Sequence, residues 1–158
     1  MKKTAVFPGS FDPVTIGHEA LIKRALPLFD QIIIGIGVNT KKKYMFSLDR
    51  RIEWLNEIFG DEPRIKIASY SGLTTDFCLK NNAGYILRGL RSSADFEFER
   101  NIAQMNYAMQ NTIESVFLVT TPELSAINSS IVRDIIKNKG SVSAFIPKQI
   151  TINETDIL

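Results

Sequence analysis

The chain has 158 residues, enough to bury the core of one domain without metals or disulfides, and we expect residues 1–158 to form that single domain. Its 19 Lys and Arg residues nearly balance 17 Asp and Glu residues, and a net charge of +2 argues against nucleic acid as a partner. One cysteine excludes a disulfide framework. We interpret Cys78 as a small buried hydrophobe, with a reactive thiol as the alternative. Without a charged-then-apolar leader or a long apolar span, we expect a cytoplasmic protein with no membrane partner.

Five short apolar runs alternate along the chain with five segments in which apolar residues recur at helical spacing. We expect strands at residues 4–7, 31–38, 64–69, 85–87 and 115–119. We expect helices at residues 17–26, 48–59, 74–81, 95–109 and 130–138, with a further turn near 142–145. Pro27 should end or bend the first helix, and Ser47 should cap the second. Strict alternation predicts an α/β fold with a doubly wound five-stranded parallel sheet.

The connection between the first strand and the first helix is rich in proline and glycine and reads PGSFDPVTIGH from residue 8 to residue 18. Gly9 and Gly17 permit close approach of a ligand or of neighbouring backbone. The helix that follows offers unpaired N–H groups to an anion. His18, the only histidine, either donates to a phosphate oxygen or titrates near neutral pH, unless it is a simple cap or surface residue. The segment is neither a Walker A loop nor a dinucleotide fingerprint.

Polar residues gather after the strands, at the edge where a doubly wound sheet binds its ligand. The opposite connections, residues 60–63 and 81–84, read as plain turns. The polar clusters comprise Ser10, Asp12, Thr15 and His18, then Asn39, Thr40, Lys41, Lys42 and Lys43, then Arg88 to Asp95, and finally Thr120 to Glu123 and Ser125 to Ser130. This one-sided distribution predicts a binding site at the carboxyl ends of the strands.

Arg88 and Arg91 are suited to phosphate because each guanidinium can donate two parallel hydrogen bonds. The alternative is a salt-bridged helix start, and Asp95 and Glu99 could also orient these arginines while meeting a ligand hydroxyl. Likewise, Ser129 and Ser130 are either helix caps or part of a triphosphate cradle.

With these motifs, the chain resembles the bacterial phosphopantetheine adenylyltransferases of the nucleotidylyltransferase superfamily over nearly its whole length. The resemblance rests on Pro8-Gly9-Ser10-Phe11-Asp12-Pro13 with Thr15-x-Gly17-His18, on Lys42 with Met45-Phe46, on Arg88-Gly89-Leu90-Arg91 with Asp95-Phe96-Glu97 and Glu99, and on Ile127-x-Ser129-Ser130 with Arg133. It implies a Rossmann-like nucleotidylyltransferase fold and transfer of AMP from ATP to 4′-phosphopantetheine. The products are dephospho-coenzyme A and pyrophosphate.

The resemblance also implies residue roles. His18 would stabilise charge at the α-phosphate, and Lys42 and Arg91 complete the implied catalytic set. Ser10, Lys42, Thr74 and Arg88 would bind the acceptor. The implied ATP site comprises Ser10, Phe11, His18, Gly89, Leu90, Arg91, Glu99, Leu124, Ser125, Ala126, Ile127, Asn128, Ser129 and Ser130.

Further implications are Mg²⁺ bound through substrate phosphates, feedback binding of coenzyme A, and a homohexamer. Three positions depart from the family pattern: Tyr44, Leu124, which cannot stack as an aromatic would, and Asn128, which interrupts a serine run. The alternatives are a related nucleotidylyltransferase with another phosphorylated acceptor and a non-catalytic adenine-nucleotide sensor. The combination of Ser10, His18, Lys42 and Arg88 favours the enzyme, because a sensor needs no second anion site.

Overall fold

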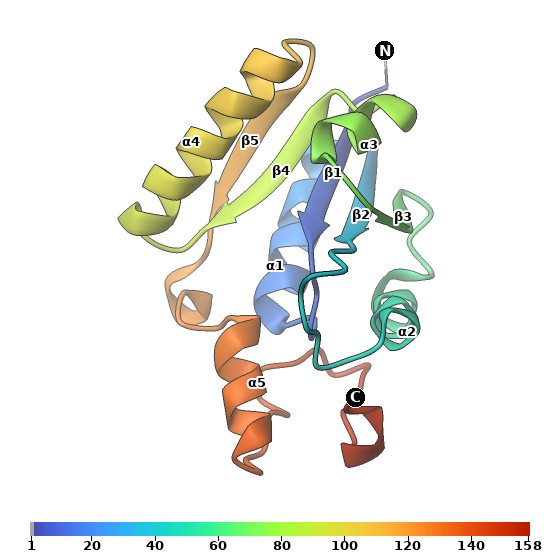
Figure 1. Cartoon of the computed structure of the whole chain (residues 1–158), viewed down its shortest axis with the longest axis vertical. Coiled ribbons are helices and arrows are strands. Elements are labelled where there is room, and N and C mark those ends of the chain that lie inside the picture. The colour runs from blue at the N-terminus through green and yellow to red at the C-terminus, as the bar shows by residue number, and fades with distance from the viewer. Residues whose placement is uncertain (1) are drawn as a thin grey trace.

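A five-stranded parallel sheet in the order β3-β2-β1-β4-β5 forms the centre of the computed structural model, which describes residues 2–158 (Figure 1). Its strands are β1 Thr4–Gly9, β2 Gln31–Gly37, β3 Ile65–Tyr70, β4 Tyr85–Leu90 and β5 Glu114–Val119. Its helices are α1 Ile16–Ala25, α2 Leu48–Phe59, α3 Thr74–Lys80, α4 Ser93–Met109 and α5 Ser129–Lys137. The predicted doubly wound α/β fold is therefore confirmed.

Alternate residues of the strands pack into two apolar cores, one on each face of the sheet. Ala5 and Phe7 of β1 belong to the larger core, which includes residues of α1 and α2 such as Ile22 and Trp54. Val6, between them, belongs to a smaller core with Phe77 and Cys78 of α3. Because successive side chains of a strand point to opposite faces, helices must cover both faces of this sheet.

The sheet opens at the point where the strand order reverses. β1 pairs with β2 over all six of its residues but with β4 at only Ala5 and Val6. Beyond these pairs the carboxyl ends of β1 and β4 diverge, which is where a doubly wound sheet binds its ligand. α5 and the C-terminal segment lie beyond the same ends (Figure 1).

Several local predictions are confirmed and others are corrected. α1 ends at Ala25, and Pro27 lies in a short 3₁₀ turn, Leu26–Leu28, that follows it directly. The Ser47 side chain caps α2. The predicted turn near residues 142–145 is closed by a 2.8 Å bond from the Phe145 N–H to the Val142 carbonyl. β4, however, runs to Leu90, so that Arg88 lies within the strand and not in the loop after it. No helix in the described part of the chain is long and apolar enough to cross a membrane.

Candidate active site

The turn after β1 has a strained residue at its centre. Phe11 has a φ of 49°, in the left-handed region, and its side chain is buried beneath the turn. A Cβ at Gly9 would lie 3.0 Å from the Phe11 ring, so glycine makes room for that ring. The Phe11 ring is thus withdrawn from solvent, and its centroid lies 5.1 Å from that of the His18 ring.

His18 is held in a defined orientation at the start of α1. The Thr15 N–H donates to His18 Nδ1 at 3.0 Å, and the His18 N–H approaches Thr15 Oγ1 at 3.5 Å, which forms a capping box. Since Nδ1 accepts, the proton of the neutral ring is on Nε2, which is left free to donate. Burial, with the nearby charges of Arg91 and Arg88, lowers the pKa of His18 to about 4. Of the two roles left open for this residue, the structure favours a neutral donor over a group that titrates near neutral pH.

Asp12 fixes the loop that carries Lys42. Its buried carboxylate accepts the backbone N–H groups of Met45 and Phe46, both at 2.9 Å. This brings Lys42 back over the first turn, where its Nζ lies 3.1 Å from Ser10 Oγ. Two predicted acceptor-binding residues separated by 32 positions in sequence are thus in contact.

Arg88 is fixed where β1 and β4 diverge. Its guanidinium forms a two-pronged ion pair with Glu99 of α4, with N···O distances of 2.9 and 2.6 Å. The guanidinium also donates a hydrogen bond of 2.9 Å to the Pro8 carbonyl oxygen. Pro8 lies near the end of β1, beyond the residues that pair with β4, so Arg88 supplies a hydrogen-bond donor there. Glu99 is only 8% exposed, so this ion pair holds the arginine rigidly between the two strands.

Arg91 is held by the other acidic residue. Asp95 accepts the Arg91 N–H at 3.0 Å and lies 3.3 Å from its Nε. The prediction that Asp95 and Glu99 orient the arginines is correct, with one acid for each. The Arg91–Asp95 pair is also the salt-bridged helix start that was the alternative, so both interpretations hold for this residue.

The start of α5 closes the far side of the site. Asn128, and neither Ser129 nor Ser130, is the N-cap: its side chain accepts the Ile131 N–H at 2.9 Å. Of the two alternatives left open for the serines, the helix cap is therefore wrong, and both serines belong to the first helical turn. Ser129 Oγ donates to the Pro13 carbonyl at 2.8 Å, and Arg133 bridges the Asp12 carbonyl and Ser130 Oγ at 2.7 and 3.2 Å.

Two adjoining cavities lie at this edge of the sheet. The first, of about 350 Å³, contains most of the charged site residues and is here called the ATP-side cavity, after the substrate that the resemblance implies for these residues. The second, of about 300 Å³, lies between α3, α4 and the face of β4 and β5, and it is called the acceptor-side cavity because it holds Thr74, which the resemblance assigns to the acceptor. Both are lined by Pro8, Gly9, Ser10, Arg88 and Glu99, which form their common wall.

Most predicted site residues line one of these cavities. The ATP-side cavity receives Ser10, Phe11, His18, Lys42, Arg88, Gly89, Arg91, Glu99, Leu124, Ile127, Asn128, Ser129 and Ser130. Thr74 lines the acceptor-side cavity and bonds to the Tyr70 hydroxyl at 2.8 Å. Three residues of the implied ATP site, Leu90, Ser125 and Ala126, line neither.

Gly89 has a packing role beside its place in the cavity. A Cβ at this position would collide with the side chain of Leu21 on α1. The glycine thus lets α1 pack closely on β4 and brings His18, three residues earlier on the same helix, toward the strand end.

Sequence reasoning pointed to residues 70–74 beside the acceptor but missed the rest of the apolar wall of the acceptor-side cavity. Ile102 and Ala103 of α4 and Phe117 of β5 form this missed part. The pairing of β4 with β5 brings Phe117 to the site. Arg133, which was not among the predicted site residues, also lines the ATP-side cavity. Its position four residues after Ser129 places it on the same face of the helix and could have indicated this.

Comparison with known proteins identifies the family. A phosphopantetheine adenylyltransferase from Flavobacterium psychrophilum is 53% identical over 150 residues, covering 95% of this chain and 99% of the relative. The chain belongs to the phosphopantetheine adenylyltransferase family. A relative of the same name from Christiangramia forsetii is 51% identical over 92% of this chain and 95% of its own length, and one from Bacteroides fragilis is 43% identical over 92% and 97%.

Two broader comparisons agree with this family. The cytidylyltransferase-like family model matches residues 6–135, a range that includes every predicted site residue. A solved structure from Vibrio parahaemolyticus, provisionally assigned as a nicotinate-nucleotide adenylyltransferase, superposes with a TM-score of 0.70 over 94% of this chain and 90% of that one. At 16% identity, that structure shares the fold with this adenylyltransferase-family chain.

Proposed function

We propose that the chain transfers the AMP moiety of ATP to the phosphate of 4′-phosphopantetheine and releases pyrophosphate, giving dephospho-coenzyme A. The observation that carries this proposal is the pair of cavities joined at Ser10 and Arg88. A direct transfer between two phosphates requires two anion sites within reach of each other. An attack by the acceptor phosphate on the α-phosphorus needs no covalent enzyme intermediate.

His18 is the proposed stabiliser of the transition state. Its Nε2–H is free to donate while Thr15 holds Nδ1. A neutral imidazole with a pKa of about 4 keeps this donor in one form across the physiological pH range. Oriented donors lower the barrier when negative charge grows on the phosphoryl oxygens and the leaving pyrophosphate. Arg91, whose charge is felt at His18, is the proposed cationic partner on the ATP side.

On the acceptor side, Ser10 and Lys42 are proposed to hold the attacking phosphate, and Arg88 to assist from the wall between the cavities. The 3.1 Å contact of Lys42 with Ser10 supports this grouping. The pantetheine arm is long and mostly neutral, which suits a cavity with walls of Ile102, Ala103 and Phe117. Thr74 lies at the same cavity.

ATP is proposed to bind across the start of α5 and the end of β4. The backbone N–H groups of the first α5 turn and the Arg91 guanidinium favour its phosphates. Leu124 and Ile127 line the same cavity and supply apolar surface for adenine in place of an aromatic ring. Leu90, Ser125 and Ala126 line neither cavity and are proposed to contact ATP through backbone groups.

Magnesium is proposed to bind through oxygens of the substrate phosphates. The donor set of the site fits this arrangement, because Asp95 and Glu99 are paired with arginines and Asp12 accepts two backbone N–H groups. When bound, Mg²⁺ neutralises charge on the phosphates.

We further propose a cytoplasmic, single-domain enzyme that assembles as a homohexamer. Association is supported by the apolar side chains that α4 and the edge strand β5 expose, among them Phe98, Met105 and Val119 at 66%, 63% and 67%. Coenzyme A contains both a pantetheine arm and an adenine nucleotide. It is therefore proposed as a feedback ligand that spans the two cavities.

Product formation tests the proposed reaction. With ATP and Mg²⁺, pyrophosphate release should require 4′-phosphopantetheine and should equal dephospho-coenzyme A formation. Pantetheine should not be adenylated, because it lacks the attacking phosphate. Adenylation of nicotinamide mononucleotide with none of 4′-phosphopantetheine would contradict the acceptor and leave a related nucleotidylyltransferase. ATP binding without any pyrophosphate release would favour a sensor.

A further inference from the structure

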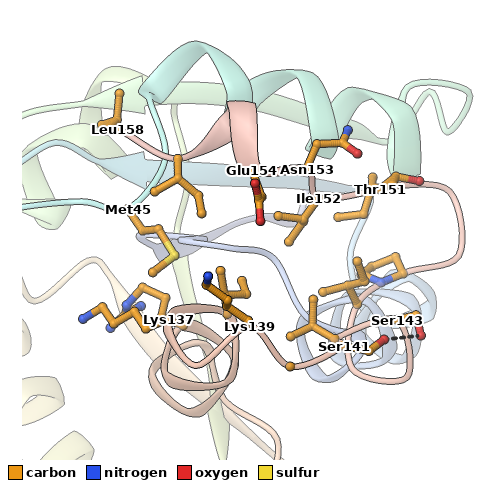
Figure 2. A pocket seen from close by; sticks show the side chains of 18 of the residues that line it. Met45, Lys137, Lys139, Ser141, Ser143, Thr151, Ile152, Asn153, Glu154 and Leu158 are labelled. Carbon is orange, nitrogen blue, oxygen red and sulfur yellow. Dashed lines mark hydrogen bonds between the residues drawn. The ribbon is translucent and has the colours of Figure 1, made fainter.

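A third cavity lies between α5 and the C-terminal segment and shares only Arg133 with the ATP-side cavity. It has a volume of about 1130 Å³ and is here called the C-terminal groove. Figure 2 shows Lys137 and Lys139 on one side of it and Ile152, Glu154 and Leu158 on the other. Its size is comparable with the largest sites of roughly 300–1,000 Å³ that hold small ligands.

Part of the lining of the groove is apolar and belongs to the larger core. Val142, Ile146 and Ile150 form this part and are 9%, 5% and 5% exposed. The opposite wall is tied down at its end, since the Leu158 N–H donates to the Met45 carbonyl at 2.9 Å and Asp156 pairs with Arg50 at 2.9 Å. The groove is therefore bounded by ordered structure on both sides.

The rim of the groove is strongly basic. Five cationic side chains line it, against the single carboxylate of Glu154. The four lysines of the rim form no ion pair within 4.0 Å anywhere in residues 2–158, and all four are exposed. Unpaired cations around an apolar trough attract a ligand that carries a negative charge on an apolar body. The cations are Lys43, Arg133, Lys137, Lys139 and Lys148.

We propose that the C-terminal groove binds an amphiphilic anion, an alkyl or acyl chain with a phosphate or carboxylate head group. The chain would lie over Val142, Ile146 and Ile150, and the head group among the rim lysines. A second copy of the protein fits the groove less well, because a symmetric contact would bring two basic rims together. The apolar surface suited to self-association lies instead on α4, at the opposite end of the molecule from α5 (Figure 1).

Calorimetry on the full chain with dodecyl phosphate tests the site. Arg133 lines both the groove and the ATP-side cavity, so ATP is kept saturating to exclude binding of the head group there. We expect saturable binding of one molecule per chain, with butyl phosphate, inorganic phosphate and uncharged dodecanol each at least roughly tenfold weaker. Dodecanoate, run in parallel, distinguishes a fatty acid from a phosphorylated amphiphile as the natural source of this chemistry.

A matched pair of double variants locates the binding. Lys139→Gln/Lys148→Gln removes two rim charges and should weaken dodecyl phosphate binding roughly fivefold to tenfold. Lys66→Gln/Lys80→Gln removes the same charge from the exposed surface of β3 and α3 and should leave the affinity unchanged. No saturable binding, equal affinity for dodecanol, or equal losses in both double variants would overturn the proposal.

Discussion

The two cavities of the active site are similar in volume but opposite in character. The ATP-side cavity is built from strand-end turns and a helix start, and it presents His18, Lys42 and Arg91. The acceptor-side cavity is built from the packing of α4 on β4 and β5, and apart from the shared wall it presents mainly apolar side chains. In the proposed reaction, charge would select and activate the phosphates, and apolar shape would select the neutral arm of the acceptor. The common wall at Ser10 and Arg88 is where the two requirements meet.

The largest expected effect comes from removing the donor at the reaction centre. His18→Ala should lower kcat roughly 10²–10³-fold with little change in ATP affinity, because the bond matters chiefly in the transition state. Initial rates with both substrates saturating, beside ATP calorimetry, measure this separation. Since the ring also packs on Phe11, circular dichroism should show that the variant is folded. Turnover at the level of the original protein would exclude the role.

The next effect tests whether Lys42 and Arg91, which both line the ATP-side cavity, contact the phosphates of different substrates. Lys42→Ala should raise the KM for 4′-phosphopantetheine, and Arg91→Ala should raise the KM for ATP. A charged hydrogen bond is worth about 1.5–3 kcal/mol, so each KM should rise roughly tenfold to a hundredfold. Lys42 makes this test sharp, because it lines the ATP-side cavity while its Nζ contacts Ser10 on the common wall. Equal effects of both variants on both constants, in initial-rate grids, would contradict a divided site.

A smaller effect is expected from narrowing the apolar cavity. Ala103→Leu places three extra carbons in the wall of the acceptor-side cavity and should raise the KM for 4′-phosphopantetheine roughly fivefold, with the KM for ATP unchanged. Ala108→Leu makes the same change on α4 at a position that lines neither cavity, and it serves as the control. A rise in the ATP constant, or the same rise in the control, would show that this wall does not select the acceptor.

The difference between the cavities also explains what could be predicted from the sequence. The charged cavity could be predicted because its residues lie in short sequence segments, residues 8–18 and Arg88 to Asp95, whose turn residues and charges are recognisable. Their placement at one edge of the sheet follows from the strict alternation of strands and helices. The apolar side depends on contacts between distant segments. Ile102 and Ala103 are ordinary helical residues until β5 pairs with β4 and brings Phe117 opposite them.

Backbone detail accounts for the remaining differences. β4 continues through Arg88 and Gly89 although the apolar run stops at Leu87, because pairing with β5 and the Arg88 bond to Pro8 satisfy the extended chain. Asn128 caps α5 one residue before the serines, and only the geometry of the turn decides between three neighbouring polar candidates. The protonation of His18 depends in the same way on a backbone N–H three residues earlier.

The smallest expected effect concerns His18, the residue whose removal should have the largest effect. We expect that its imidazole does not titrate near neutral pH. A His18 pKa lowered to about 4 predicts no inflection of kcat from this residue as the pH passes through 6.5. Because the unfolded chain binds the proton near pH 6.5 and the folded chain only near 4, stability should fall as the pH drops through this interval and level off below it. As His18 is the only histidine, its ring resonances need no assignment, and nitrogen chemical shifts report which ring nitrogen carries the proton. A midpoint near 6.5, or a proton on Nδ1 at neutral pH, would contradict the capping-box geometry and with it the neutral donor.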